Sequence, residues 1–178
     1  MNSPAHPRIL VACIGNIFLG DDGFGCEVAR TLAAISLPPE ATVIDFGIRA
    51  FDLAFALIEP YQTIILVDTI ARGSQPGTVY VLQPATDAAD TSGPEIFDPH
   101  SMDPARLLRL AQTLGEISAG IYIVGCEPLD FGEELEGRMG LSQPVHAAVP
   151  EAAAAVIELI QRATQLDNTA VRELSSAS

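Results

Sequence analysis

The fold is decided by the stretch Cys13-Ile14-Gly15-Asn16-Ile17-Phe18-Leu19-Gly20-Asp21-Asp22-Gly23-Phe24-Gly25. The apolar residues 9–12 before it predict a buried strand, and residues 27–32 after it predict a helix. In α/β folds, a loop between a parallel strand and a helix lies at the carboxyl edge of the sheet, where ligands bind. This loop carries one amide and two adjacent carboxylates but no lysine, so we expect it to hold a cation or a proton rather than a phosphate.

The composition indicates one packed domain spanning residues 1–178. A hydrophobic fraction of 48% in 178 residues favours a globule with a full core over disorder. We expect residues 1–7 and 167–178 to form flexible tails, because both segments are polar ends of the chain.

The charge and the hydropathy exclude several classes of protein. With a net charge of −14 and only nine Lys and Arg, the chain has no basic stripe for nucleic acid or for an anionic membrane. No apolar run is long enough to span a bilayer, and the first residues lack the regions of a signal peptide. Cys13, Cys26 and Cys126 form no CxxC pair, so we expect buried thiols in a reducing compartment. The predicted location is cytoplasmic.

Strands and helices alternate along the chain. Strands are predicted at 9–12, 42–46, 63–67, 78–82 and 121–124, and helices at 27–32, 51–58, 103–114 and 144–165. The link over 70–77 is too short for a helical crossover, so the strand at 78–82 should run antiparallel at or near one side. This order predicts a mixed sheet with helices on both faces.

Three segments leave alternatives open. Residues 84–100 read as a long loop, a kind that is often functional. The acidic loop 127–143 is either solvated or lines a groove for a partner. Pro150 either kinks the last helix or marks its true first turn.

Three side chains stand out as candidates for chemistry, and each also has a purely structural interpretation. Asp22 and its neighbour Asp21 could instead cap the first helix. Asp68 could be a structural hydrogen-bond acceptor at the end of a buried strand, and His100 could be a solvated loop residue. We expect Asn16 to bond the turn in which it sits. Taken together, Asp22, Asp68 and His100 follow or precede elements whose loops can meet at one edge of the sheet. Two carboxylates and an imidazole would suit nickel, zinc, iron or manganese.

A series of short motifs runs along nearly the whole chain: Gly15-Asn16-x5-Asp22-Gly23-x-Gly25, Asp45-x-Gly47, Ile65-Leu66-Val67-Asp68-Thr69, Pro76-Gly77-Thr78, Pro99-His100 and Gly125-x-Glu127-Pro128. In this order and spacing they resemble the hydrogenase maturation endopeptidases, which remove a short C-terminal extension from the large subunit of nickel–iron hydrogenases after nickel insertion. Two positions depart from the family pattern: Cys13 stands where relatives commonly have glycine, and so does Ala50.

The resemblance implies an α/β three-layer sandwich, with a mostly parallel five-stranded sheet, one antiparallel strand and helices on both faces. It also implies that Asp22, Asp68 and His100 contact nickel, that Asp22 and Asp68 are catalytic, and that Asn16 and Gly47 bind substrate. The nickel would arrive with the substrate, the precursor of the hydrogenase large subunit, and another divalent metal could substitute. The implied activity is that of an aspartyl endopeptidase.

Two other functions remain open at this point. A non-catalytic, nickel-dependent module that escorts the large subunit would use the same ligands but release the subunit uncut. A dinucleotide-binding domain is disfavoured, because Cys13 replaces a leading glycine and Asp21 and Asp22 would face the pyrophosphate.

Overall fold

The chain forms five strands and four α-helices in the residues that the computed structural model describes, which are 8–84, 104–131 and 137–176; side chains are described over 8–84, 106–131 and 137–165. The strands are β1 (Ile9–Ile14), β2 (Ala41–Gly47), β3 (Thr63–Thr69), β4 (Val79–Leu82) and β5 (Gly120–Cys126). The helices are α1 (Phe24–Ala33), α2 (Ala50–Leu57), α3 (Pro104–Leu114) and α4 (Gln143–Ser176), with the short 3-10 helix η1 (Gly20–Gly23) before α1.

The five strands make one sheet in the order β2-β1-β3-β5-β4. β1 pairs in parallel with β2 and β3, β3 pairs in parallel with β5, and β4 pairs antiparallel with β5. The antiparallel strand predicted from the short link over 70–77 is therefore confirmed, and it lies at one edge of the sheet. The three-layer α/β fold is confirmed as well.

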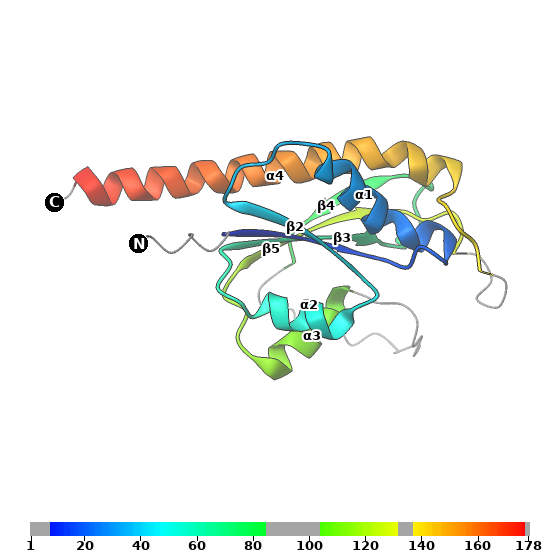
Figure 1. The fold of residues 1–178 in the computed structure, drawn as a ribbon, viewed down its shortest axis with the longest axis horizontal. Coiled ribbons are helices and arrows are strands. Elements are labelled where there is room, and N and C mark those ends of the chain that lie inside the picture. Colours follow the sequence, from blue (N-terminus) through cyan, green and yellow to red (C-terminus); the bar gives the residue numbers. More distant parts are fainter. Residues whose placement is uncertain (1–7, 85–103, 132–136, 177–178) are drawn as a thin grey trace.

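Helices cover both faces of the sheet, α1 and α4 on one and α2 and α3 on the other (Figure 1). The side chains of the inner strand β1 alternate between the two layers of helices. Val11 and Cys13 pack into the core beneath α1 and α4, while Leu10, Ala12 and Ile14 pack into the core against α2 and α3. Every residue of β1 is buried, as its continuous apolar sequence predicts for a parallel strand covered on both sides. Each fully buried large aliphatic side chain stabilises the fold by about 1.5–3 kcal/mol.

The last helix is longer than the sequence predicted. α4 begins at Gln143 and continues beyond the expected end at Gln165 to Ser176, so the expected tail from residue 167 is helical as far as Ser176. Its far end extends past the sheet in Figure 1. Pro150 lies inside α4, so the interpretation that it marks the first turn is wrong. Proline cannot donate a helical hydrogen bond and its ring crowds the preceding turn, yet the helix continues on both sides of Pro150.

The expected tail 1–7 lies outside the described residues. So does the expected long loop over 84–100, apart from residue 84. Over the ranges described, no helix is both long and apolar enough to cross a membrane.

Candidate functional site

The loop after β1 is folded tightly against the neighbouring loop after β2. Gly15 has a φ of +147°, which favours glycine, and its N–H donates to the carbonyl of Gly47 over 3.1 Å. A Cβ on Gly15 would lie 1.9 Å from the carbonyl oxygen of Asp22, so only glycine lets the loop close there. The turn therefore depends on Gly15, while Cys13, the departure from the family pattern, is an ordinary buried residue of β1.

Asp22 closes this loop with its side chain. Its Oδ2 accepts the backbone N–H of Asn16 over 2.9 Å, and the Asn16 amide oxygen accepts the N–H of Phe18 over 3.0 Å. The prediction that Asn16 bonds its own turn is confirmed. The N-cap position of α1 is occupied by Gly23, not by Asp21 or Asp22, so the capping interpretation is wrong. The Asp22 side chain is half-buried.

Asp68 lies at the end of β3, one residue beyond Val67, which is in register with Cys13 of β1. Its side chain is 4% exposed, and its Oδ1 accepts the N–H of Thr69 over 2.7 Å. η1, which contains Asp22, contacts β3. The loops carrying Asp22 and Asp68 are thus neighbours at the carboxyl edge of the sheet, together with Asn16 and Gly47.

His100 lies outside the described residues. Within residues 8–84, 104–131 and 137–176, no three His, Cys, Asp or Glu side chains gather as a metal site. The chemistry of the donors nevertheless fits a divalent ion in part, because Asp22 and Asp68 bring carboxylate oxygens to one edge and borderline metals accept mixed oxygen and nitrogen ligands.

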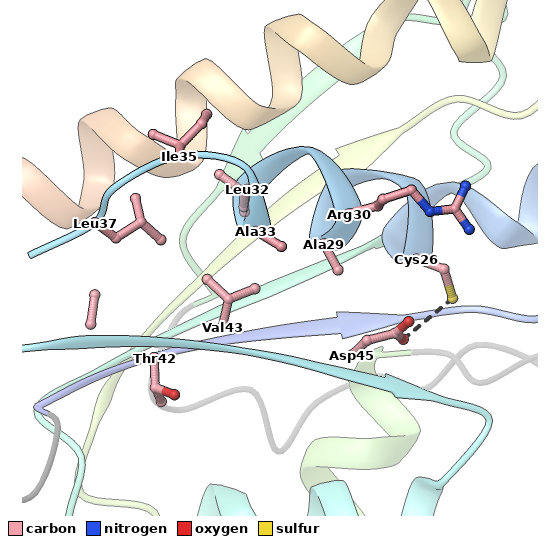
Figure 2. Close-up of a pocket in the computed structure, with 11 residues that line it drawn as sticks. Cys26, Ala29, Arg30, Leu32, Ala33, Ile35, Leu37, Thr42, Val43 and Asp45 are labelled. Atoms are coloured by element: carbon pink, nitrogen blue, oxygen red, sulfur yellow. Dashed lines mark hydrogen bonds between the residues drawn. The ribbon is translucent and has the colours of Figure 1, made fainter. Parts of the chain in front are cut away.

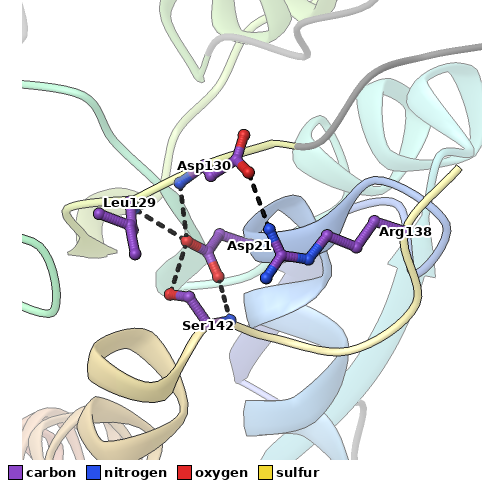
Figure 3. A network of polar contacts seen from close by, with 5 residues as sticks. All are labelled: Asp21, Leu129, Asp130, Arg138 and Ser142. Carbon is purple, nitrogen blue, oxygen red and sulfur yellow. Dashed lines mark hydrogen bonds and ion pairs between the residues drawn. The ribbon is translucent and has the colours of Figure 1, made fainter. Parts of the chain in front are cut away.

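Asp21 has a different role from its neighbour Asp22. Asp21 is 1% exposed, and its carboxylate accepts four hydrogen bonds. Oδ2 accepts the backbone N–H of Leu129 over 2.8 Å and that of Asp130 over 3.0 Å. Ser142 donates its N–H to Oδ1 over 2.6 Å and its hydroxyl to Oδ2 over 2.9 Å. Figure 3 shows this carboxylate between the loop after β5 and the residue before α4. Because charged acceptors make strong hydrogen bonds, Asp21 fastens both segments to the candidate site.

The acidic loop 127–143 is consequently held against the site loop, as far as it is described. The backbone N–H of Arg138 donates to the carbonyl of Phe18 over 2.8 Å. The guanidinium of Arg138 forms an ion pair with the Asp130 carboxylate over 2.8 Å. Exposed apolar side chains stand along this contact, with 57% of Phe18, 58% of Leu129 and 72% of Met139 accessible. The interpretation as a solvated acidic loop is therefore incomplete, since it missed this apolar rim.

Glu127, the first residue of the acidic loop that the sequence left either solvated or lining a groove, is buried. Its carboxylate accepts the hydroxyl of Tyr80 over 2.6 Å and the N–H groups of Arg72 and Gly73 over 2.8 and 3.0 Å. Burial acts to raise the pKa of Glu127, but these hydrogen bonds outweigh it and lower the pKa below its ordinary value. Glu127 thereby fixes the segment that follows Asp68.

The Cys26 thiol and the Asp45 carboxylate meet beside Gly15. The thiol of Cys26 lies 3.4 Å from Oδ1 of Asp45 and 3.6 Å from the carbonyl of Gly15, and the same Oδ1 accepts the N–H of Gly47 over 2.9 Å. Burial and the adjacent Asp45 charge raise the pKa of Cys26 to about 12. This thiol is therefore a neutral structural group and not a nucleophile. All three cysteines are free and buried, as predicted.

The chain is similar in sequence and in fold to known hydrogenase maturation proteases. A family model described as hydrogenase maturation protease matches residues 26–159. A Methanocaldococcus jannaschii protein assigned to the hydrogenase maturation proteases is 32% identical over 155 residues, which are 86% of this chain and 97% of that protein.

Solved structures agree with this match. The hydrogenase 2 maturation peptidase of a Thaumarchaeota archaeon is similar with a TM-score of 0.62 and 27% identity, over 86% of this chain and 97% of that one. The hydrogenase maturating endopeptidase HybD of Escherichia coli has a TM-score of 0.68 over 88% of this chain and 93% of that one. At 24% identity, that second likeness shows the fold.

Proposed function

The chain belongs to the hydrogenase maturation proteases, which are peptidases, and from that premise we propose that it removes the C-terminal extension from the nickel-loaded precursor of a nickel–iron hydrogenase large subunit. The family resemblance seen in the sequence is confirmed; the substrate and the residue roles that follow are our proposal. The observation that carries it is the pair of acids, Asp22 and Asp68, in adjacent loops at the carboxyl edge of the sheet.

We assign both acids to contact with the metal and to catalysis, with His100 as the third ligand. Nickel bound in the precursor supplies Lewis-acid chemistry, polarising the scissile carbonyl or acidifying a water. Asp68, almost fully buried, is held by the N–H of Thr69 and keeps a fixed direction. Asp22, half-buried, is the better placed of the two to exchange a proton with substrate or water. Another divalent ion with the same preference for oxygen and nitrogen could substitute.

Substrate binding falls to Asn16 and Gly47 in this proposal. Asn16 is bonded to Asp22, and Gly47 is bonded to the neighbouring Gly15, so both lie where an incoming chain would approach the acids. The apolar rim formed by Phe18, Leu129 and Met139 supports a macromolecular partner, because exposed apolar groups beside a site are typical of protein-binding surfaces. Three free cysteines favour a reducing compartment, so we propose that the protein works in the cytoplasm.

The direct test is to incubate the protein with a nickel-loaded precursor large subunit and, in parallel, with a nickel-free one. We expect mass spectrometry to show loss of the extension from the loaded form only. A loaded precursor that is bound and released intact would instead identify an escort protein.

The Asp22→Asn variant tests the role of the carboxylate. Asparagine retains an oxygen that can accept the N–H of Asn16, so we expect the fold to survive. Processing should fall by about 100-fold or more, the usual contribution of a positioned acid or base. Glu158→Gln, an exposed change on α4, serves as the matched control. Normal processing by Asp22→Asn would show that Asp22 has no catalytic part.

A further inference from the structure

A second feature of the chain borders the candidate site and has no role in the function proposed above. It is a groove of about 460 Å³ between α1 and β2, lined by apolar side chains together with the polar side chains of Arg30, Thr42 and Asp45. Figure 2 shows the groove with Ile35 and Leu37 at one end, and Cys26 and Asp45 at the other. The volume lies within the range of sites that hold organic ligands.

The strand that forms one wall of this groove is at the edge of the sheet. β2 pairs with β1 on one side, and in the part of the chain that the structure describes no strand pairs with its other side. An edge strand offers a row of backbone donors and acceptors that an extended peptide can use. In such binding, backbone hydrogen bonds give affinity, and alternate side chains enter neighbouring pockets and give specificity.

The groove also leads to the proposed catalytic acids. At its end, the Cys26 thiol contacts both Asp45 and the carbonyl of Gly15, and Asp45 accepts the N–H of Gly47. Gly15 in turn packs against the backbone of Asp22. A chain lying in the groove would therefore emerge beside Asp22. From Ala41 to Asp45 the strand is about 13 Å long, enough for about four or five residues of extended peptide.

We propose that this groove and the outer edge of β2 bind the C-terminal extension of the substrate as an added strand, with apolar side chains at alternate positions entering the groove. The inference rests on the proposed function and adds the place and conformation of the cleaved segment. Ala29, Ala33 and Val43 are small or medium side chains on the walls, which leaves the space for those apolar groups.

The test fills the groove without disturbing the core. Ala33 is exposed and lines the groove, so Ala33→Trp should occupy it and leave the fold intact. Ile35→Asp, also at an exposed lining residue, replaces an apolar wall by a charge. Ala34→Trp is the matched control, because Ala34 is the next residue along the chain and is exposed but does not line the groove. Thermal unfolding of each variant checks the fold.

The readout is the kinetics of extension removal from the nickel-loaded precursor. We expect Ala33→Trp and Ile35→Asp to raise KM about tenfold or more with little change in kcat, because they weaken binding of the extension and leave the acids in place. Binding of the mature subunit, which lacks the extension, should be unchanged.

Two results would overturn the inference. Kinetics of both variants equal to those of Ala34→Trp would show that the extension binds elsewhere. An equal loss of affinity for the mature subunit would show that another part of the partner, and not the extension, lies in the groove. Both results leave the proposed function intact, whereas failure of the unaltered protein to trim the loaded precursor would contradict the function itself.

Discussion

Two adjacent residues of the same type, Asp21 and Asp22, have separate roles in this chain. Asp21 is buried and accepts hydrogen bonds from Leu129, Asp130 and Ser142, whereas Asp22 is half-buried and closes the loop at Asn16. The first carboxylate holds the loops of the site together, and the second is the one that we propose acts on the substrate. The distinction follows from their partners, since the residues themselves are identical.

We predict that Asp21→Asn destabilises the protein. An asparagine has one acceptor oxygen, and its NH2 group would face N–H donors, so at least one buried donor is left unpaired. The free energy of unfolding should fall by about 2–3 kcal/mol, measured by urea denaturation. Asp130→Asn is the control, because its ion pair with Arg138 is exposed and contributes little. A loss for Asp21→Asn no larger than that of the control would contradict the structural role.

The sequence could not separate the two acids because the partners of Asp21 lie far along the chain. Leu129 and Ser142 are 108 and 121 residues away, and no local pattern reports such contacts. The surroundings of Glu127 stayed open for the same reason, since its donors at Arg72 and Gly73 come from another loop. By contrast, Asn16 bonds Phe18 two residues away, a contact that turn chemistry predicts.

At the scale of helices and strands, the sequence was informative wherever the signal was local or periodic. The continuous apolar runs of β1 and β3 predicted buried parallel strands, and the short link after β3 predicted the antiparallel β4. The far boundary of α4 was wrong, because the mostly polar segment beyond Gln165 predicts a frayed end yet remains helical to Ser176. Residues with good helix propensity can continue a helix that packing has already started.

Glu127 connects two of these elements, and its charge makes the connection dependent on pH. The carboxylate at the end of β5 holds the turn that follows β3. Since the pKa of Glu127 is lowered from its ordinary value of 4.5, its stabilising effect is complete above that pH and is lost as the pH falls through the lowered pKa.

We therefore predict that Glu127→Gln is less stable than the unaltered protein by about 1–3 kcal/mol at neutral pH. The difference should shrink as the pH falls below 4.5, because protonation removes the same charge from Glu127. Urea denaturation of both proteins across this range measures it. Glu158→Gln, an exposed change, should show a small difference throughout. A gap that stays constant or widens in acid would show that the charge of Glu127 does not hold the turn.

At the scale of the whole molecule, apolar packing and charge act in opposite directions. Two buried cores flank the sheet and hold the helices against it. The charge instead disfavours compaction, because 23 Asp and Glu against nine Lys and Arg leave a net charge of −14. Repulsion among like charges destabilises a compact state. The ion pairs in the described parts of the chain, such as Arg30–Glu27 and Arg162–Glu158, are exposed and offset little of it.

Salt should therefore stabilise this protein. Screening weakens repulsion across the whole surface, while the exposed ion pairs that it also weakens contribute little. Raising the ionic strength from about 20 mM to about 300 mM should increase Tm by about 2–4 °C, which corresponds to about 1 kcal/mol for a chain of this size. Calorimetry in NaCl and KCl at equal ionic strength measures the shift, and equal shifts show that screening, not binding of one ion, is the cause. A Tm that falls with salt would mean that the ion pairs outweigh the repulsion, which their exposure argues against.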